Sequence, residues 1–141
     1  MGQVKSEIEM KQVINADPHG RIALQGYDPV AFHTTGKAVK GKPDMLAEYQ
    51  GYKYLFSSEE NKASFIEEGE IYLPAYGGYC AFGVSRGVLF PVEIETWEII
   101  DGRLVLQYSM NVEQRFEEER EENIRKANEN WRKIETATAD E

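Results

Sequence analysis

The sequence predicts an α+β fold: a single small domain with two antiparallel hairpins, short helices and a long C-terminal helix. Strand-forming residues flank short turns twice, within 46–57 and within 97–108. Apolar residues recur at helical spacing between 112 and 134. The chain has 141 residues, of which 41% are apolar, and this is enough for one modest core. We therefore expect a polar arm at 1–20, one domain at 21–135 and a frayed tail at 136–141.

Short elements are expected before the first hairpin. The polar arm leads into residues 21–24, whose composition suits a short strand. Asp28 is placed to cap a short helix, with Pro29 at the first helical position, where its missing N–H costs nothing. That helix is predicted to run to about Thr34 and to stop at Gly36.

A unit of strand, turn, strand and helix follows. Residues 46–50 and 52–57 flank a Gln-Gly turn, and the second run is rich in aromatic residues. Ser57, with Glu60 three positions later, matches a capping box, so a helix is expected to begin there. This helix is predicted to end at Gly69.

A second hairpin and a last helix complete the predicted fold. Asp101-Gly102 is a strong two-residue turn signal between strands at 97–100 and 104–108. Ser109 or Asn111 then caps one continuous helix. Six glutamates between 113 and 122 give this helix an acidic face, which is predicted to be a solvated surface or, alternatively, an interaction surface.

Charge and composition exclude several functional classes. With 25 acidic and 16 basic residues the formal net charge is −9, so nucleic acids and anionic membrane surfaces are not expected as partners. No apolar run approaches the ~20 residues that a membrane span needs. Residues 1–6 lack the apolar segment of a signal peptide, so a cytoplasmic location is expected unless a signal was removed. A single cysteine excludes an intrachain disulfide and a zinc site of the CxxC type.

The segment 74–83, which reads PAYGGYCAFG, holds the only cysteine and is the leading candidate site. Gly77 and Gly78 free nearby backbone N–H groups to face a ligand or a thiolate. A helix that begins near Gly78 would place Cys80 in its first turn, where a thiolate is stabilised and reactive. The alternative is that Cys80 is a buried small apolar residue, as free cysteines commonly are.

His33, at the end of the predicted short helix, is the candidate partner of Cys80. A thiolate and an imidazole together make a soft site for a transition metal such as copper, and they are also the minimum set for a cysteine nucleophile with a base. Alternatively, His33 is exposed or caps helix carbonyls. Asp28 is a helix cap or a polar group of the site. Four tyrosines either pack with their hydroxyls bonded or line a small-ligand pocket: Tyr27, Tyr54, Tyr76 and Tyr79.

Four motifs occur along the chain: GYDPVA at 26–31, EYxGxxYxFSS at 48–58, YGGYCAFG at 76–83 and NWxKI at 130–134. In this order and spacing the chain resembles the YHS-domain proteins, specifically the longer stand-alone bacterial type. The resemblance implies a small α+β fold with a hairpin-plus-helix unit at its centre. It also implies that a periplasmic location is possible, because exported members with signal peptides are common in the long-form family.

The resemblance also concerns metals, because shorter YHS domains are associated with heavy metals. Their motif reads Asp-Pro-Val-Cys, followed by Phe-Cys-Ser-x-x-Cys. This chain has Ala31, Ser57 and Asn61 at the three cysteine positions. Alanine or a neutral serine cannot supply the donor strength of a thiolate, so the short-form metal site is absent. Any metal would have to be held elsewhere, at Cys80 and His33.

The leading hypothesis is a small, non-enzymatic binding or sensing module. Its expected ligand is a transition metal such as copper, or a small molecule, held near Cys80 with His33 and the tyrosines. Two alternatives remain open: a thiol-dependent redox or acyl-transfer enzyme that uses Cys80, and a protein-interaction module that uses the acidic helix.

Overall fold

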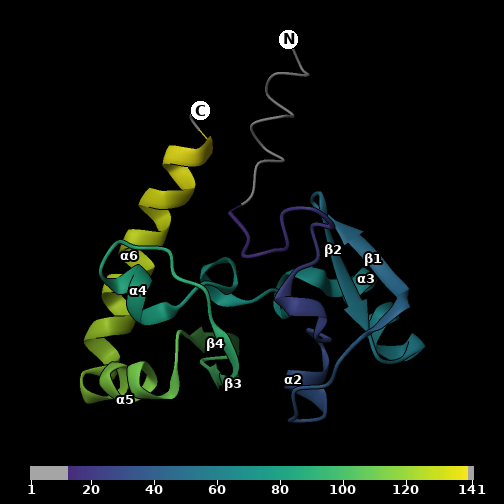
Figure 1. Cartoon of the computed structure of the whole chain (residues 1–141), viewed down its shortest axis with the longest axis horizontal. Coiled ribbons are helices and arrows are strands. Elements are labelled where there is room, and N and C mark those ends of the chain that lie inside the picture. The colour runs from purple at the N-terminus through teal and green to yellow at the C-terminus, as the bar shows by residue number, and fades with distance from the viewer. Residues whose placement is uncertain (1–12, 140–141) are drawn as a thin grey trace.

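Two separate antiparallel hairpins organise the computed structural model, which describes residues 13–139 and the side chains of residues 13–137 (Figure 1). The first hairpin pairs β1 (Lys42–Tyr49) with β2 (Tyr52–Phe56). The second pairs β3 (Glu93–Ile100) with β4 (Arg103–Gln107). Helices surround the hairpins, and the long α6 (Arg120–Ala139) is the last of them. The predicted α+β class is therefore confirmed.

Both hairpin turns form where the sequence predicts them. Gln50 and Gly51 have φ angles of 52° and 89°, and Asp101 and Gly102 have φ angles of 51° and 80°. Two successive positive φ angles are typical of the type I′ turn, whose twist matches that of the flanking strands. The first strand begins at Lys42 rather than at 46, because pairing with β2 resumes beyond a bulge.

The described helices before α6 are shorter, and the first of them ends as predicted. Gly36 has a φ angle of 70°, and its N–H donates to the carbonyl of Ala31, as in a helix C-terminus that turns left-handed. The bounds are α2 (Ala31–Thr34), α3 (Glu59–Tyr72), α4 (Ala81–Ser85) and α5 (Met110–Glu118), with 3₁₀ turns η1 (Leu24–Gly26) and η2 (Ala75–Gly78).

The predicted N-cap and the predicted end of α3 are both wrong. Ser58, not Ser57, caps the helix, and its hydroxyl accepts the N–H of Asn61 at 3.1 Å. Gly69 does not end the helix, which continues to Tyr72 past a kink at Glu68. A Cβ at Gly69 would lie 3.1 Å from the ring of Tyr49, so this glycine serves close packing on β1 rather than termination.

The C-terminal helix is two helices, not one. Ser109 caps α5 and accepts the N–H of Val112 at 3.2 Å, but Glu119 leaves the helical region with φ −139° and ψ 57°. The amide of Asn123 then donates to the carbonyl of Phe116 at 2.9 Å, so the break leaves this group satisfied. Of the predicted tail, residues 136–139 continue α6, and residues 140 and 141 lie outside the described residues.

Residues 21–24 do not form the predicted strand. They make only isolated bridges, one between Ala23 and Ala16 and one between Ile22 and Lys53 of β2, and Leu24 begins η1 instead. Within residues 13–139, no helix combines the length and apolar character needed to cross a membrane.

The second hairpin divides the C-terminal core into two sides. Val105 packs in a cluster with Ala81 and Val84 of α4, whereas Leu104 and Leu106 pack in another cluster with Phe32 of α2. Successive residues of a strand point to opposite faces, so β4 presents one side chain set to α4 and the other to α2. Figure 1 shows α4 and α2 well apart in the fold.

A buried carboxylate joins α2 to the first hairpin. Asp28 is fully buried, and its Oδ1 accepts the N–H groups of Val30 at 2.8 Å and Ala31 at 3.3 Å. Its Oδ2 accepts the N–H of Ser57 at 2.8 Å, the hydroxyl of Ser57 at 2.7 Å and the amide of Asn61 at 2.8 Å. Asp28 therefore caps the turn that leads into α2, although the helix begins at Ala31 rather than at the predicted Pro29, and it also fixes α2 against the junction of β2 and α3.

We expect Asp28→Asn to lower the free energy of unfolding by about 2–4 kcal/mol, although the side chains have the same shape. The new NH₂ group would face donors on whichever side it took, since all five partners of Asp28 donate. Urea unfolding followed by circular dichroism measures the change. The exposed Asp44→Asn is the matched control and should stay within about 0.5 kcal/mol of wild type. Equal stability of the Asp28 variant and wild type would contradict this account.

Candidate functional site

Cys80 is placed at the N-cap of α4, close to its predicted position in the first turn of a helix. Its side chain is buried, with the residue 1% exposed. The sulfur accepts the N–H of Gly83 at 3.4 Å, and the thiol donates to the side-chain oxygen of Gln107 at 3.5 Å. The same Gln107 oxygen accepts the N–H of Phe82 at 3.0 Å. The thiol is therefore held by neutral groups on both sides.

The backbone around Cys80 is fixed from two directions. Cys80 forms a bridge with Leu106 of β4, and its N–H donates to the carbonyl of Phe90 at 3.1 Å. Gly83 lets the loop at 87–91 lie against α4, because a Cβ there would stand 3.0 Å from both the Phe90 ring and the Val88 carbonyl. A larger residue at 83 would force this loop away from the helix.

A pocket of about 540 Å³ opens beside Cys80. This volume falls in the range of sites that hold small molecules, and the lining is mainly apolar and aromatic, as in such sites. Two rings, Phe90 and Tyr108, lie with centroids 5.9 Å apart at this pocket. The lining residues are Cys80, Phe82, Gly83, Phe90, Pro91, Tyr108, Val112 and Arg115.

Two of the side chains that line the pocket, Phe90 and Tyr108, are exposed, and so are apolar side chains next to them in sequence. Val88, Leu89 and Phe90 of the 87–91 loop are about 40–45% exposed, and Tyr108 and Met110 are about half exposed. Large apolar side chains gathered at a surface mark binding sites more often than isolated ones do. The sequence contained a signal for this that was missed, namely the apolar run at 88–91 inside an irregular segment.

His33 is not part of this pocket. It lies in α2, whose Phe32 packs with Leu104 and Leu106 on one face of β4, whereas the Cys80 thiol bonds Gln107, whose side chain points to the other face. Its ring packs edge-on against Tyr72 at 5.3 Å. Its Nε2 is buried and has no hydrogen-bond partner in the described part of the chain. Burial lowers the pKa of His33 below its ordinary value of 6.5.

The residues present do not fit a transition-metal centre at the predicted place. Cys80 and His33 are separated by the second hairpin, and the groups that contact the thiol are an amide oxygen and a backbone N–H. Among residues 13–139, no group of three or more His, Cys, Asp and Glu side chains is arranged to hold a metal ion. A copper or zinc ion would lack the donors it prefers there.

Ala31, Ser57 and Asn61 stand at the positions where the resemblance would place cysteine ligands. These three residues do meet in space, but they meet around the carboxylate of Asp28. Ala31 donates its backbone N–H, Ser57 its N–H and hydroxyl, and Asn61 its amide, all to Asp28. These donors cannot also serve as metal ligands, so hydrogen bonds occupy this junction.

Two of the four candidate tyrosines lie in the N-terminal half, away from Cys80. Tyr54 is buried against the ring of Phe65 at 5.0 Å, and burial raises the pKa of Tyr54. Tyr27 has the ammonium of Lys40 over its ring at 4.8 Å. Both are explained by packing on β2 and η1 rather than by a common pocket.

The other two tyrosines fix neighbouring elements. The Tyr76 hydroxyl donates to the side-chain oxygen of Asn128 in α6 at 2.9 Å, and burial raises the pKa of Tyr76. The Tyr79 hydroxyl donates to the carbonyl of Ile14 at 3.4 Å. The tyrosine that does line the Cys80 pocket is Tyr108, which the sequence analysis did not single out.

Gly77 and Gly78 hold the segment at 13–16 through their carbonyls. The Gly77 carbonyl accepts the N–H of Asn15 at 2.8 Å, and the Gly78 carbonyl accepts the side-chain amide of Asn15 at 3.2 Å. A Cβ on Gly77 would lie 2.0 Å from the carbonyl oxygen of Val13. This chain crossing explains Gly77 more directly than exposure of N–H groups to a ligand does, and Gly78 has a φ angle of 83°, which favours glycine.

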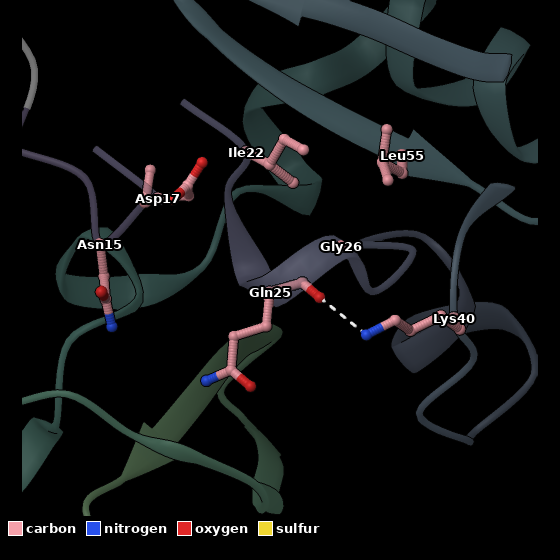
Figure 2. A pocket seen from close by; sticks show the side chains of 8 residues that line it. Asn15, Asp17, Ile22, Gln25, Gly26, Lys40 and Leu55 are labelled. Atoms are coloured by element: carbon pink, nitrogen blue, oxygen red, sulfur yellow. Dashed lines mark hydrogen bonds between the residues drawn. The ribbon is translucent and has the colours of Figure 1, made fainter. Parts of the chain in front are cut away.

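A second cavity, of about 500 Å³, lies where the segment at 13–17 passes η1 and β2 (Figure 2). Figure 2 shows Lys40 reaching across to the carbonyl of Gln25, to which it donates at 3.1 Å. The Gln25 amide donates to Val92 at 3.0 Å, and the Asp17 carboxylate accepts the N–H of Gly20. These polar groups already have hydrogen-bond partners in the protein, so they offer a ligand little that is unsatisfied.

Comparisons with known proteins find no matching family model, no matching curated protein and no matching solved structure.

We expect Gly77→Ala to lower the free energy of unfolding by more than 2 kcal/mol, because its Cβ would collide with the Val13 carbonyl and with Trp131. Gly36→Ala is the matched control. It has a similar φ angle, 70° against 61°, but open space around its Cβ, so it should cost about 1 kcal/mol from backbone strain alone. Thermal and urea unfolding measure both. Equal losses would show that the close crossing at Gly77 is not formed.

We expect His33→Phe to be at least as stable as wild type at neutral pH, because it keeps the ring packing and removes a buried nitrogen without a partner. Since the folded pKa of His33 is lowered, the unfolded chain takes up the proton first as pH falls, and wild type loses stability through that interval. The gap between variant and wild type should therefore widen from about pH 7 to about pH 5. His19→Gln, at an exposed position, is the control.

Proposed function

We propose that this protein is a non-enzymatic binding module of YHS-like type, and that its site is the pocket beside Cys80. The resemblance is supported by three positions that it marks as neighbours. Residue 31 lies far in sequence from residues 57 and 61, yet all three bond to Asp28. The ligand proposed for the site is a small molecule rather than a metal ion, since the donors around Cys80 do not suit a metal.

The observation that carries the proposal is the pocket itself. It combines a volume of about 540 Å³, a wall of aromatic and aliphatic side chains, and exposed apolar residues at its edge. Phe90 and Tyr108 keep roughly half of their surface in water, and burying that half of each ring would contribute about 1 kcal/mol. A ligand with an apolar or aromatic body would gain this contribution by covering them.

Thiol chemistry is less well supported by the geometry. A cysteine nucleophile needs a base within hydrogen-bond reach, and the side chain that contacts the Cys80 thiol is the amide of Gln107, which cannot take its proton. His33 lies across the second hairpin. Cys80 therefore acts as part of the pocket wall in this proposal.

The acidic helix is also less well supported as an interaction surface. Several of its glutamates have basic partners within the protein: Glu117 with Arg120 at 2.8 Å and Glu122 with Arg125 at 2.8 Å. Such pairs are common on solvated helices and contribute little to stability.

We expect phenylbutanol, a neutral molecule with an aromatic ring and a short chain, to bind this pocket with a roughly millimolar Kd, given its size. A titration followed by ¹H–¹⁵N NMR should give saturable shifts at the amides of Cys80, Gly83 and Val112. Val112→Phe should fill the pocket and weaken binding at least tenfold.

Ile66→Phe is the matched control for this experiment. It also introduces a phenylalanine on a helix, but Ile66 is 66% exposed on α3 and does not line the pocket. Binding should be unchanged. Shifts scattered over the surface, or equal binding by the Val112 variant and wild type, would overturn the proposal.

A further inference from the structure

Arg115 is the charged residue that lines the Cys80 pocket, and it lies one turn from Val112 on the same face of α5. Its guanidinium lies over an aromatic face, 5.2 Å from the centroid of the Phe82 ring. Within residues 13–139, no acidic group lies within 4.0 Å of Arg115, although glutamates crowd this helix. Its hydrogen-bond donors are thus available to a ligand.

Arg86 also lies over the Phe82 ring, but unlike Arg115 it has hydrogen-bond partners within the described part of the chain. Arg86 stacks on Phe82 at 4.5 Å, but its Nη1 donates to the hydroxyl of Ser85 at 3.1 Å and to the oxygen of Asn123 at 3.2 Å. Arg86 is therefore held in place by the protein. Phe82 orients both cations, and Arg115 is the one whose donors remain unused at the pocket.

The apolar wall and this arginine belong to one cavity. Phe90, Pro91 and Val112 offer contact to a hydrocarbon or aromatic body, and Arg115 offers a planar set of N–H donors that suits a carboxylate. We infer that the ligand is an amphipathic monocarboxylate, with its apolar body against the aromatic wall beside Cys80 and its carboxylate on Arg115. This inference rests on the proposed function and specifies its ligand class.

The net charge of −9 does not prevent anion binding at this place. Interactions between exposed charges fade over a Debye length, about 8 Å at physiological salt, so distant glutamates act weakly on the pocket. Close to it the cations gather: Arg86, Arg115 and Lys126 line an adjoining cavity with Phe82, together with Glu118 and Glu119. The electrostatic potential at the pocket is therefore set by these few nearby groups rather than by the net charge of the protein.

The test compares three probes of one shape: phenylbutyrate, phenylbutanol and phenylbutylamine. For wild type, we expect the carboxylate to bind roughly tenfold more tightly than the alcohol, as for one charge-assisted bond, and the amine to bind most weakly. Arg115→Gln should remove the roughly tenfold advantage of phenylbutyrate and leave phenylbutanol unchanged. Arg115→Lys should retain part of it, because the charge remains and the planar donor set is lost.

Arg132→Gln is the matched control. It removes the same charge from an exposed position on α6 that does not line this pocket, and phenylbutyrate affinity should not change. If wild type binds the alcohol as tightly as the carboxylate, the inference fails while the proposed pocket stands. The same holds if Arg115→Gln and Arg132→Gln weaken phenylbutyrate binding equally. If none of the three probes binds, the proposed function and this inference fail together.

Discussion

The arrangement of the N-terminal half depends on one buried carboxylate. Asp28 collects five donors from three places in the chain, and it is the point where α2 meets the junction of β2 and α3. A buried carboxylate is stable only when its oxygens are bonded, so the positions of Ser57 and Asn61 are constrained as strongly as that of Asp28 itself. The resemblance to YHS-domain proteins marks the same positions for thiolates. Here, hydrogen bonds to a carboxylate connect the same segments.

The second hairpin has an equally strong effect on the candidate site. Because Val105 and Gln107 point to one face of β4 and Leu104 and Leu106 to the other, each face has its own neighbours. α4 and Cys80 lie on the first face, and α2 with its histidine lies on the second. A metal centre or a catalytic pair made from Cys80 and His33 would need these faces to coincide. The pocket is instead built from α4, α5 and the loop at 87–91, which share the first face.

Local signals predicted the conformation at most positions where one residue decides it, although Ser58 rather than Ser57 caps α3. The turns at Gly51 and Gly102, the stop at Gly36 and the caps at Asp28 and Ser109 all formed as predicted, because each depends on short-range backbone chemistry. Errors arose where packing overrode such signals. Gly69 stays inside a helix against a tyrosine ring, and the C-terminal helix breaks at Glu119, where Asn123 satisfies a carbonyl.

The sequence by itself determined the fold class and the two hairpins, and it singled out the segment around Cys80 as a candidate site. Only the tertiary structure decided what surrounds that thiol. Which side chains share a pocket depends on which face of a strand each element packs against, and a single sequence does not reveal pairings between distant segments. The packing of α5 beside α4 therefore shows that Tyr108, Val112 and Arg115 line the candidate site. His33, which the sequence suggested, does not line it.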